Sequence, residues 1–230
     1  MTSETFMNHQ VVSLQFAIFF REAIQKPYAA FEDINRSMMA VFDGQPQMMD
    51  LPPMLPADVP LITYRAENQE YVCNISRARI DLHVQRISEE KSNAEVFCDF
   101  NAKTELFVKY VLSKTEAARF GMICRYFFPS DDAITVIQKK YLKNKLSGLS
   151  ELNIRFNKPT EFDSLRINDI VEISATQVVI NGKNHDGIFV QRDINNQPQE
   201  GLAISLDQLE KISRQFAVQV SEASIQELIK

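Results

Sequence analysis

Two arginines stand in the most apolar stretch of the chain. Arg119 and Arg125 lie within residues 116–128, where aromatic and aliphatic residues dominate. A guanidinium held in such a strand needs acceptors, since charges away from water are normally paired. Salt bridges to carboxylates at the edge of the core are the interpretation we favour. A bound anion or nucleotide phosphate, with Arg125 as its contact, is the alternative.

Lysines form one dense basic cluster after this strand. Lys139, Lys140, Lys143 and Lys145 end a helix that is predicted to begin at residues 130–132. Positive charge at the C-terminal end of a helix complements the helix dipole, so a solvated helix end explains the cluster. The alternative is contact with the phosphates of a nucleic acid through Lys139, Lys140 and Lys143.

Catalytic chemistry has one weak candidate. His83 and Asp81 are two residues apart in a predicted strand, so their side chains share a face. Arg79 lies on that face too, which favours a surface charge pair over an acid–base pair. An enzyme that uses Arg125, His83 and Asp81 is therefore the least favoured hypothesis. The sequence has no Gly-x-Ser-x-Gly elbow, no Gly-x-x-x-x-Gly-Lys loop and no zinc-ligand spacing, so no catalytic residue, cofactor or metal is predicted.

Residues 45–60 form an unusual segment with five prolines and three methionines. Prolines at this density exclude a helix or the interior of a sheet, so the segment is predicted to be an extended surface loop. Packing of its apolar side chains on its own domain is the simpler interpretation. A docking surface for another protein is the alternative, because methionines adapt to varied apolar partners. Its candidate contacts are Met48, Met49, Met54 and Leu55.

The composition is that of an ordinary globular protein. The chain has 230 residues, of which 45% are hydrophobic and 24% charged, and its formal net charge is −5. Such an acidic chain is a poor candidate for a general nucleic-acid coat, although a local basic patch is compatible with it. Cys73, Cys98 and Cys124 are few and far apart, which predicts reduced core residues. The start of the chain lacks a basic signal region, and the apolar run 11–20 is about half a membrane span, so we expect a cytoplasmic protein without membrane contact.

Hydrophobic periodicity predicts two halves with the same order of elements, namely strand, helix, three strands and helix. Residues 1–114 and 115–230 are therefore predicted to be two similar βαβββα halves of one compact α+β unit. Its sheet would be mostly antiparallel, with the helices packed against it. The first half would comprise a strand at 11–20, a helix at 27–43, strands at 61–65, 71–75 and 79–85, and a helix at 92–111. The second half would comprise a strand at 117–128, a helix from 130 to about 143, strands at 152–156, 171–180 and 187–194, and a helix at 205–220.

The leading strand of each half is its most hydrophobic one. Strands 11–20 and 117–128 are therefore expected to be central in the sheet and adjacent to each other. Because strand 117–128 is apolar on both faces, we expect a sheet that is covered on both sides.

Several short segments resemble those of a known family. They are Tyr71-Val-Cys-Asn-Ile, Arg79-Ile-Asp-Leu, Arg119-Phe-Gly-Met-Ile-Cys-Arg-Tyr, and a long last helix with Phe216, Ser221 and Ile225. Together with the order of the elements, they make nearly the whole chain similar to a sporadically distributed family of uncharacterised bacterial proteins. The resemblance brings no catalytic residues. It implies an accessory role in a bacterial system, such as defence or toxin–antitoxin function.

These observations lead to one favoured function and two alternatives. The lack of catalytic motifs, the loop at 45–60 and the exposed strand edges favour a non-enzymatic, protein-binding accessory or regulatory subunit of a bacterial multi-protein system. The first alternative is a nucleic-acid-binding protein that uses Lys139–Lys145 together with Arg77 and Arg79. The second is the enzyme described above. The sequence carries no signal for the oligomeric state.

Overall fold

The structure, a computed structural model, describes residues 10–49, 55–88, 90–144, 146–180 and 183–230. Its strands are β1 (Gln10–Phe20), β2 (Gln47–Met48), β3 (Ile62–Arg65), β4 (Tyr71–Ile75), β5 (Arg79–Gln85), β6 (Ala117–Pro129), β7 (Leu152–Asn157), β8 (Thr160–Phe162), β9 (Leu165–Ile180) and β10 (Lys183–Asn196). Its helices are α1 (Pro27–Ala30), α2 (Ile34–Ser37), α3 (Asn93–Leu112), α4 (Ala133–Tyr141), α5 (Leu206–Gln219) and α6 (Glu222–Glu227).

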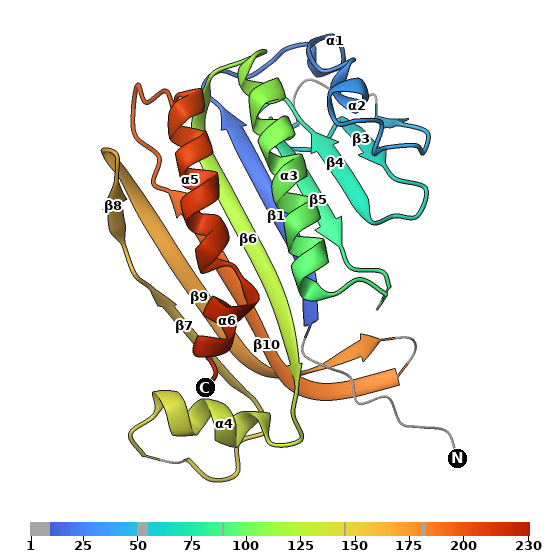
Figure 1. Ribbon diagram of the computed structural model, residues 1–230. Coiled ribbons are helices and arrows are strands. Elements are labelled where there is room, and N and C mark those ends of the chain that lie inside the picture. The colour runs from blue at the N-terminus through green and yellow to red at the C-terminus, as the bar shows by residue number, and fades with distance from the viewer. Residues whose placement is uncertain (1–9, 50–54, 89, 145, 181–182) are drawn as a thin grey trace.

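All the strands belong to one antiparallel sheet. Their order is β2-β3-β4-β5-β1-β6-β10-β9-β7, and β8 pairs with β9 beside this path. Two long helices, α3 and α5, cross the sheet side by side on the same face (Figure 1). The prediction of an α+β fold with a mostly antiparallel sheet and packed helices is therefore confirmed.

The centre of the sheet is the antiparallel pair β1–β6. Its register runs from Gln10 opposite Phe127 to Phe20 opposite Ala117, so the expectation of central, adjacent leading strands is confirmed. Strands that precede residue 115 lie on the β1 side of this pair, and later strands lie on the β6 side. That the two halves are copies of one another stays a prediction.

The hydrophobic core lies between the sheet and the helices. Phe16 of β1 is fully buried, and its ring lies 6.5 Å from that of Phe107 in α3 and 6.4 Å from that of Phe120 in β6. The helix α3 begins with the predicted capping box, in which Ser92 and Glu95 each accept a hydrogen bond from the other's backbone N–H. Burial of the apolar stripe of α3 against the strands holds this layer in place.

The expectation that both faces of the sheet are covered is wrong. The helices of the described part of the chain gather on one face (Figure 1). On the other face β6 presents Arg119, Gly121, Ile123 and Arg125, which alternate with its buried core residues. From residue 119 to residue 125, the outward positions of this apolar run are glycine, a single isoleucine and two arginines, and the next one, Phe127, is fully buried beside Gly187 of β10. These positions do not need a second helical layer.

Two further expectations for the first half are corrected. The helix predicted over 27–43 is divided into the two single-turn helices α1 and α2, which non-helical angles at Phe31 and Asp33 separate. Positive φ angles of 58° at Met39 and 57° at Ala40 end the helical path after α2. Cys73 and Cys124 are buried as predicted, but Cys98 is exposed on α3.

In the second half, the strands are longer than predicted. The strand expected at 171–180 begins at Leu165, and the one expected at 187–194 extends from Lys183 to Asn196. The short strand β8 and the two-residue strand β2 were not predicted. These segments are rich in polar residues, so the hydrophobic pattern that marks a strand is weak there, and hydrogen bonding to β9 or β3 decides their conformation.

Gly187 occupies a tight position in β10. A Cβ atom there would lie 2.6 Å from Cζ of Phe127 and in collision with the carbonyl oxygen of Phe128. We expect Gly187→Ala to lower the free energy of unfolding by about 1–3 kcal/mol, as overpacking does. Gly121→Ala is the control, because its Cβ would have Asn195 Cβ at 4.0 Å as its nearest atom. Urea denaturation of both variants tests this, and equal stabilities would contradict it.

Candidate functional site

The candidate functional site is the face of the sheet that the helices leave uncovered, which we call the bare face. Cross-strand register places its side chains in rows. In the central strands they are Ser13, Gln15, Ala17 and Phe19 of β1, Arg79, Asp81 and His83 of β5, Arg119, Gly121, Ile123 and Arg125 of β6, and Gln191, Asp193 and Asn195 of β10.

An arginine–phenylalanine–arginine row crosses the three central strands near one end of the bare face. Phe19 lies directly opposite Arg79 on one side and Arg119 on the other. The guanidinium carbons lie 5.5 Å (Arg79) and 5.0 Å (Arg119) from the centroid of the Phe19 ring. These distances are within the range of cation–π attraction, so the ring orients both side chains.

Arg119 and Arg125 lack carboxylate partners in the described part of the chain. Nη2 of Arg119 donates to Oδ1 of Asn195 at 3.5 Å, and its buried Nε has no acceptor. Arg125 donates from Nε to Oε1 of Gln191 at 2.8 Å and from Nη1 to Oγ of Ser13 at 3.3 Å. The salt bridges that we expected for these two arginines are therefore not formed by described residues. The charge of Asp193 attracts Arg125 without forming an ion pair with it, so water or an external anion is left to complete the balance of these two cations.

Asp81 and His83 do not form an acid–base pair. Oδ1 of Asp81 accepts a hydrogen bond from Gln15 at 3.2 Å, and Oδ2 lies 3.1 Å from Nε of Arg79. Burial raises the pKa of Asp81, whereas Arg79 and Gln15 lower it. Burial, with the charges of Arg125 and Arg79, lowers the pKa of His83 to about 4. No hydrogen bond joins these two described side chains, so the geometry gives His83 the role of a neutral polar residue.

Amide side chains extend the bare face toward β7. Asn157 donates to Asn168 at 3.0 Å, Asn168 donates to Asn195 at 3.2 Å, and Asn195 donates to Asp193 at 2.9 Å. On the opposite side, Thr63 donates to Asn74 at 3.0 Å. Such groups can both donate and accept, so the face offers many hydrogen bonds without a dominant charge.

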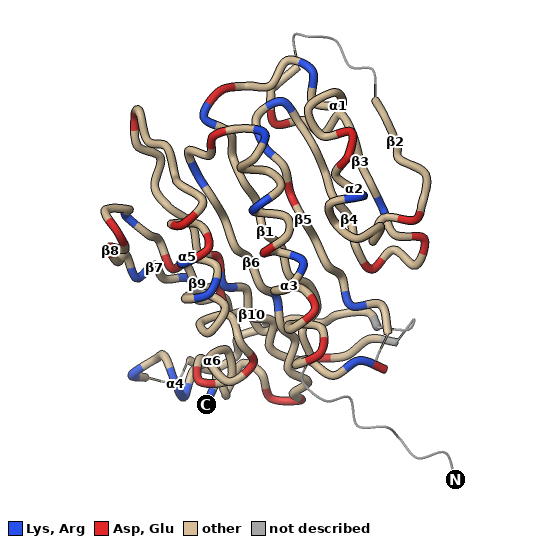
Figure 2. Tube along the Cα trace, turned by 45° about the horizontal axis from the view of Figure 1, so that its top comes forward, with Lys and Arg blue, Asp and Glu red and all other residues tan. Residues whose placement is uncertain are grey.

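The charge of the bare face differs from that of the whole chain. Arginines outnumber carboxylates on it, because Arg65, Arg79, Arg119, Arg125, Arg155 and Arg166 share it with Asp81, Glu161, Glu172 and Asp193. The chain as a whole carries a net charge of −5. On the helical side, both signs are mixed along α3 and α5 (Figure 2), and they pair across the helices, as Lys109 does with Glu210.

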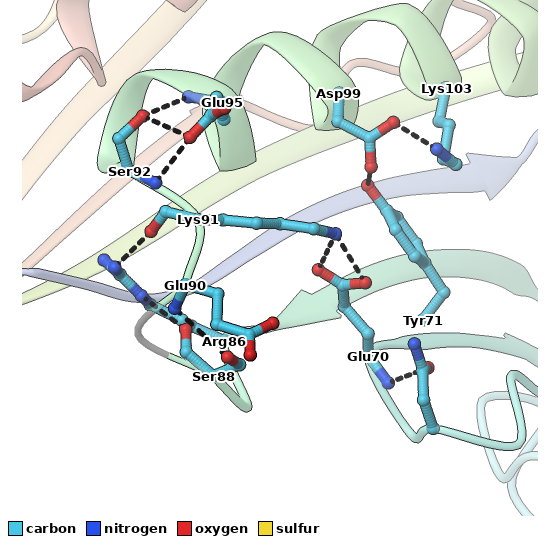
Figure 3. Close-up of polar contacts among 11 residues, drawn as sticks. Glu70, Tyr71, Arg86, Ser88, Glu90, Lys91, Ser92, Glu95, Asp99 and Lys103 are labelled. Carbon is cyan, nitrogen blue, oxygen red and sulfur yellow. Dashed lines mark hydrogen bonds and ion pairs between the residues drawn. The ribbon is translucent and has the colours of Figure 1, made fainter.

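A second polar cluster lies at the junction of α3 and β4. Oη of Tyr71 donates to Asp99 at 2.8 Å, and Lys103 pairs with the same carboxylate while its Nζ lies 4.8 Å from the Tyr71 ring centroid (Figure 3). Lys91 binds both carboxylate oxygens of Glu70, at 2.6 and 2.8 Å. These residues line a cleft of about 440 Å³.

The chemistry of this cluster is structural. Burial and the hydrogen bond to Asp99 raise the pKa of Tyr71. Burial opposes ionisation of Asp99, but hydrogen bonds from Lys103 and Tyr71 keep its pKa below the usual value. The phenol is therefore protonated and the carboxylate is engaged, which leaves neither a base nor a nucleophile. The cluster ties α3 to β4.

A third cluster surrounds Arg192, which is almost fully buried on the helical side. Its guanidinium forms two hydrogen bonds of 2.7 Å to Asp169 and also donates to the carbonyl oxygen of Gln219 at 2.5 Å and to Oγ of Ser224 at 3.0 Å. A cleft of about 520 Å³ lies beside it, lined also by Lys140, Tyr141, Phe156 and Lys158. Since the donors of Arg192 are already engaged, it anchors the junction of α5 and α6 to the sheet.

The residues proposed as an anion site from the sequence do not come together. Arg125 lies on the bare face, whereas Lys139 and Lys140 belong to α4, which packs on the helical side through the contact of Tyr141 with Phe156. Lys140 donates to the main-chain oxygen of Glu227. Lys139 and Lys143 are exposed.

The proposed docking loop is partly described. Met48 and Met49 are 56% and 49% exposed, and Leu55 is 38% exposed. Met54 lies outside the described residues. Met48 belongs to the edge strand β2 and Met49 follows it, whereas the carbonyl oxygen of Leu55 accepts a hydrogen bond from Arg77 in the turn between β4 and β5.

One residue of the bare face was not singled out from the sequence. Phe19 appeared only as part of a hydrophobic strand, although Ser13, Gln15 and Ala17 already showed that odd positions of this strand are less apolar. Its position between Arg79 and Arg119 depends on the register of β1 with β5 and β6. That register is a tertiary property, which the sequence of one strand does not show.

No protein-family model and no curated protein sequence matches the chain, so the resemblance to a bacterial family stays a prediction. In the described part of the chain, no group of three or more His, Cys, Asp and Glu residues is placed to hold a metal ion. No helix among the described residues is long and apolar enough to cross a membrane.

The low pKa of His83 predicts a loss of stability in mild acid. Below pH 6.5 the imidazole of the unfolded chain gains a proton, while the native imidazole stays neutral until about pH 4. This difference removes about 2 kcal/mol of unfolding free energy between pH 7.5 and 5. Urea denaturation at both pH values should show a loss smaller by that amount in His83→Gln. An NMR titration that places the native His83 near pH 6.5 would contradict the prediction.

Proposed function

We propose that the protein is a non-catalytic binding protein that holds an anionic macromolecule on its bare face. The observation that carries the proposal is the pair of arginines, Arg119 and Arg125, without carboxylate partners among the described residues. Both are partly buried and are fixed by neutral groups. A cation in this environment gains free energy when an anion replaces its incomplete hydration.

The shape of the surface supports a large ligand rather than a small molecule. The bare face extends over β5, β1, β6 and β10, which at about 4.8 Å per strand spacing spans roughly 14 Å. Along β6, Arg119 and Arg125 are six residues apart, or about 20 Å. Amide side chains beside them, which are hydrogen-bonded to one another, add no charge to the same area.

Retention on heparin tests this proposal. We expect the wild-type protein to be retained at low salt, in spite of its net charge of −5, and Arg119→Gln/Arg125→Gln to elute much earlier. Lys139→Gln/Lys143→Gln is the matched control, because it removes the same charge from exposed positions on the helical side. If the lysine variant elutes as early as the arginine variant, or if the wild-type protein flows through, the bare face is not the anion-binding surface.

A protein-binding accessory subunit is the second candidate function. Its supporting observation is the exposure of Met48 and Met49 at the edge strand β2, and of Leu55 in the loop that follows. Exposed methionines at a strand edge that no other described strand pairs with are suited to an apolar protein segment. This candidate concerns a different surface from the bare face, so both functions can be tested separately.

The two exposed methionines should contribute little to folding. We expect Met48→Ser/Met49→Ser to change the free energy of unfolding by about 0.5 kcal/mol or less, as surface substitutions do. Met38→Ser is the control, since Met38 is fully buried and should lose several times more. A large loss in the double variant would place these side chains in the core. A protein that co-purifies with the wild type from its host, but not with the double variant, would support the docking surface.

A further inference from the structure

We infer that the anionic ligand of the bare face is a single-stranded nucleic acid, with one base stacked at Phe19; this inference rests on the function proposed above. The strand would follow the central strands of the sheet. Its phosphates would contact Arg119 and Arg125. Single-stranded RNA and single-stranded DNA share this chemistry, and the experiment below distinguishes them.

The Phe19 row provides a stacking platform. The Phe19 side chain is partly exposed on a sheet face without helices, and its ring lies between two guanidinium groups. Bases stack on aromatic rings and on guanidinium planes, and this contact is available only when the base is not held inside a duplex. The row Arg79–Phe19–Arg119 supplies both kinds of surface side by side.

Small residues leave room for a base next to this platform. Ala17 and Gly121 lie opposite each other in the next row of the β1–β6 pair. Both residues are buried beneath their neighbours, and a Cβ atom at Gly121 would only just touch Cβ of Asn195 at 4.0 Å, so no bulky side chain rises beside the platform here. Beyond them, Asn168 and Asn195 are hydrogen-bonded to each other, and Asn195 is almost fully buried, so these amides border the platform as neutral groups.

The charge pattern favours a nucleic acid over an acidic protein surface. The unpaired cations are arginines about 20 Å apart along β6, with neutral amides and an aromatic ring among the groups between and beside them. A polyanion with regularly spaced charges and planar bases can use both cations and the aromatic ring at once. An acidic protein surface would leave the aromatic platform without a matching partner.

Fluorescence anisotropy with labelled oligonucleotides tests the inference. The probes are a 20-nucleotide oligo-U RNA, a 20-nucleotide oligo-dU DNA and a 20-base-pair duplex DNA, each titrated at 50 mM and higher salt. We expect both single strands to bind more tightly than the duplex. Tighter binding of the RNA would indicate that the 2′-hydroxyl is contacted, and equal binding would indicate that only shared groups are used.

Two variants give separate readouts. Phe19→Leu should weaken binding of single strands about tenfold while leaving retention on heparin unchanged, because only stacking is lost. Arg119→Gln/Arg125→Gln should weaken binding and reduce the slope of log affinity against log salt by about 1.4, which corresponds to two phosphate contacts. Lys139→Gln/Lys143→Gln should change neither quantity. Circular dichroism and melting temperature check that each variant is folded.

The outcomes separate this inference from the function on which it rests. Equal or tighter duplex binding, or an unchanged affinity of Phe19→Leu, would overturn the single-stranded ligand. Retention on heparin that requires the arginines, without any oligonucleotide binding, would also overturn it but would leave the binding function intact, with an acidic protein as partner. The absence of both activities would refute both proposals.

Discussion

The pairing of β1 with β6 is the constraint on which the rest of the structure depends. Each of these strands pairs on its other side with the last strand of its own half, β5 or β10, so every strand is added outward from this pair. Side chains alternate between the two faces of a strand, and a shift of one residue in the register would exchange the faces. The register therefore buries Phe16 and Phe120 and, by the same geometry, places Phe19, Arg119 and Arg125 together on the opposite face.

The two faces consequently have different roles. The helical side contains the aromatic core and clusters of charged and polar groups that are paired with one another. Examples are Arg192 with Asp169, and Tyr71 and Lys103 with Asp99. These clusters fasten helices to strands. On the bare face Arg79 pairs with Asp81, but Arg119 and Arg125 are held by neutral groups. The way in which charges are paired, rather than their number, distinguishes the helical side from the bare face.

The sequence predicted local features better than tertiary ones. Alternation in β1 and β6 identified two central strands, and the spacing of Ser92 and Glu95 located the start of α3, because these signals are carried by neighbouring residues. The single helix predicted at 27–43 was wrong, since hydrophobic spacing does not reveal the non-helical angles at Phe31 and Asp33. The arginine–phenylalanine row could not be predicted, because its members come from three strands whose register depends on the whole sheet.

The cysteines have a practical consequence for studies of this molecule. Cys73 and Cys124 are buried within the sheet, and burial raises the pKa of both thiols, so they react slowly with alkylating reagents. Cys98 is exposed on α3, on the opposite side of the sheet from the bare face. A maleimide dye or a spin label can thus be attached at one position of the native protein without any substitution. Such a probe would follow the tumbling and assembly of the molecule while leaving the arginine surface unmodified.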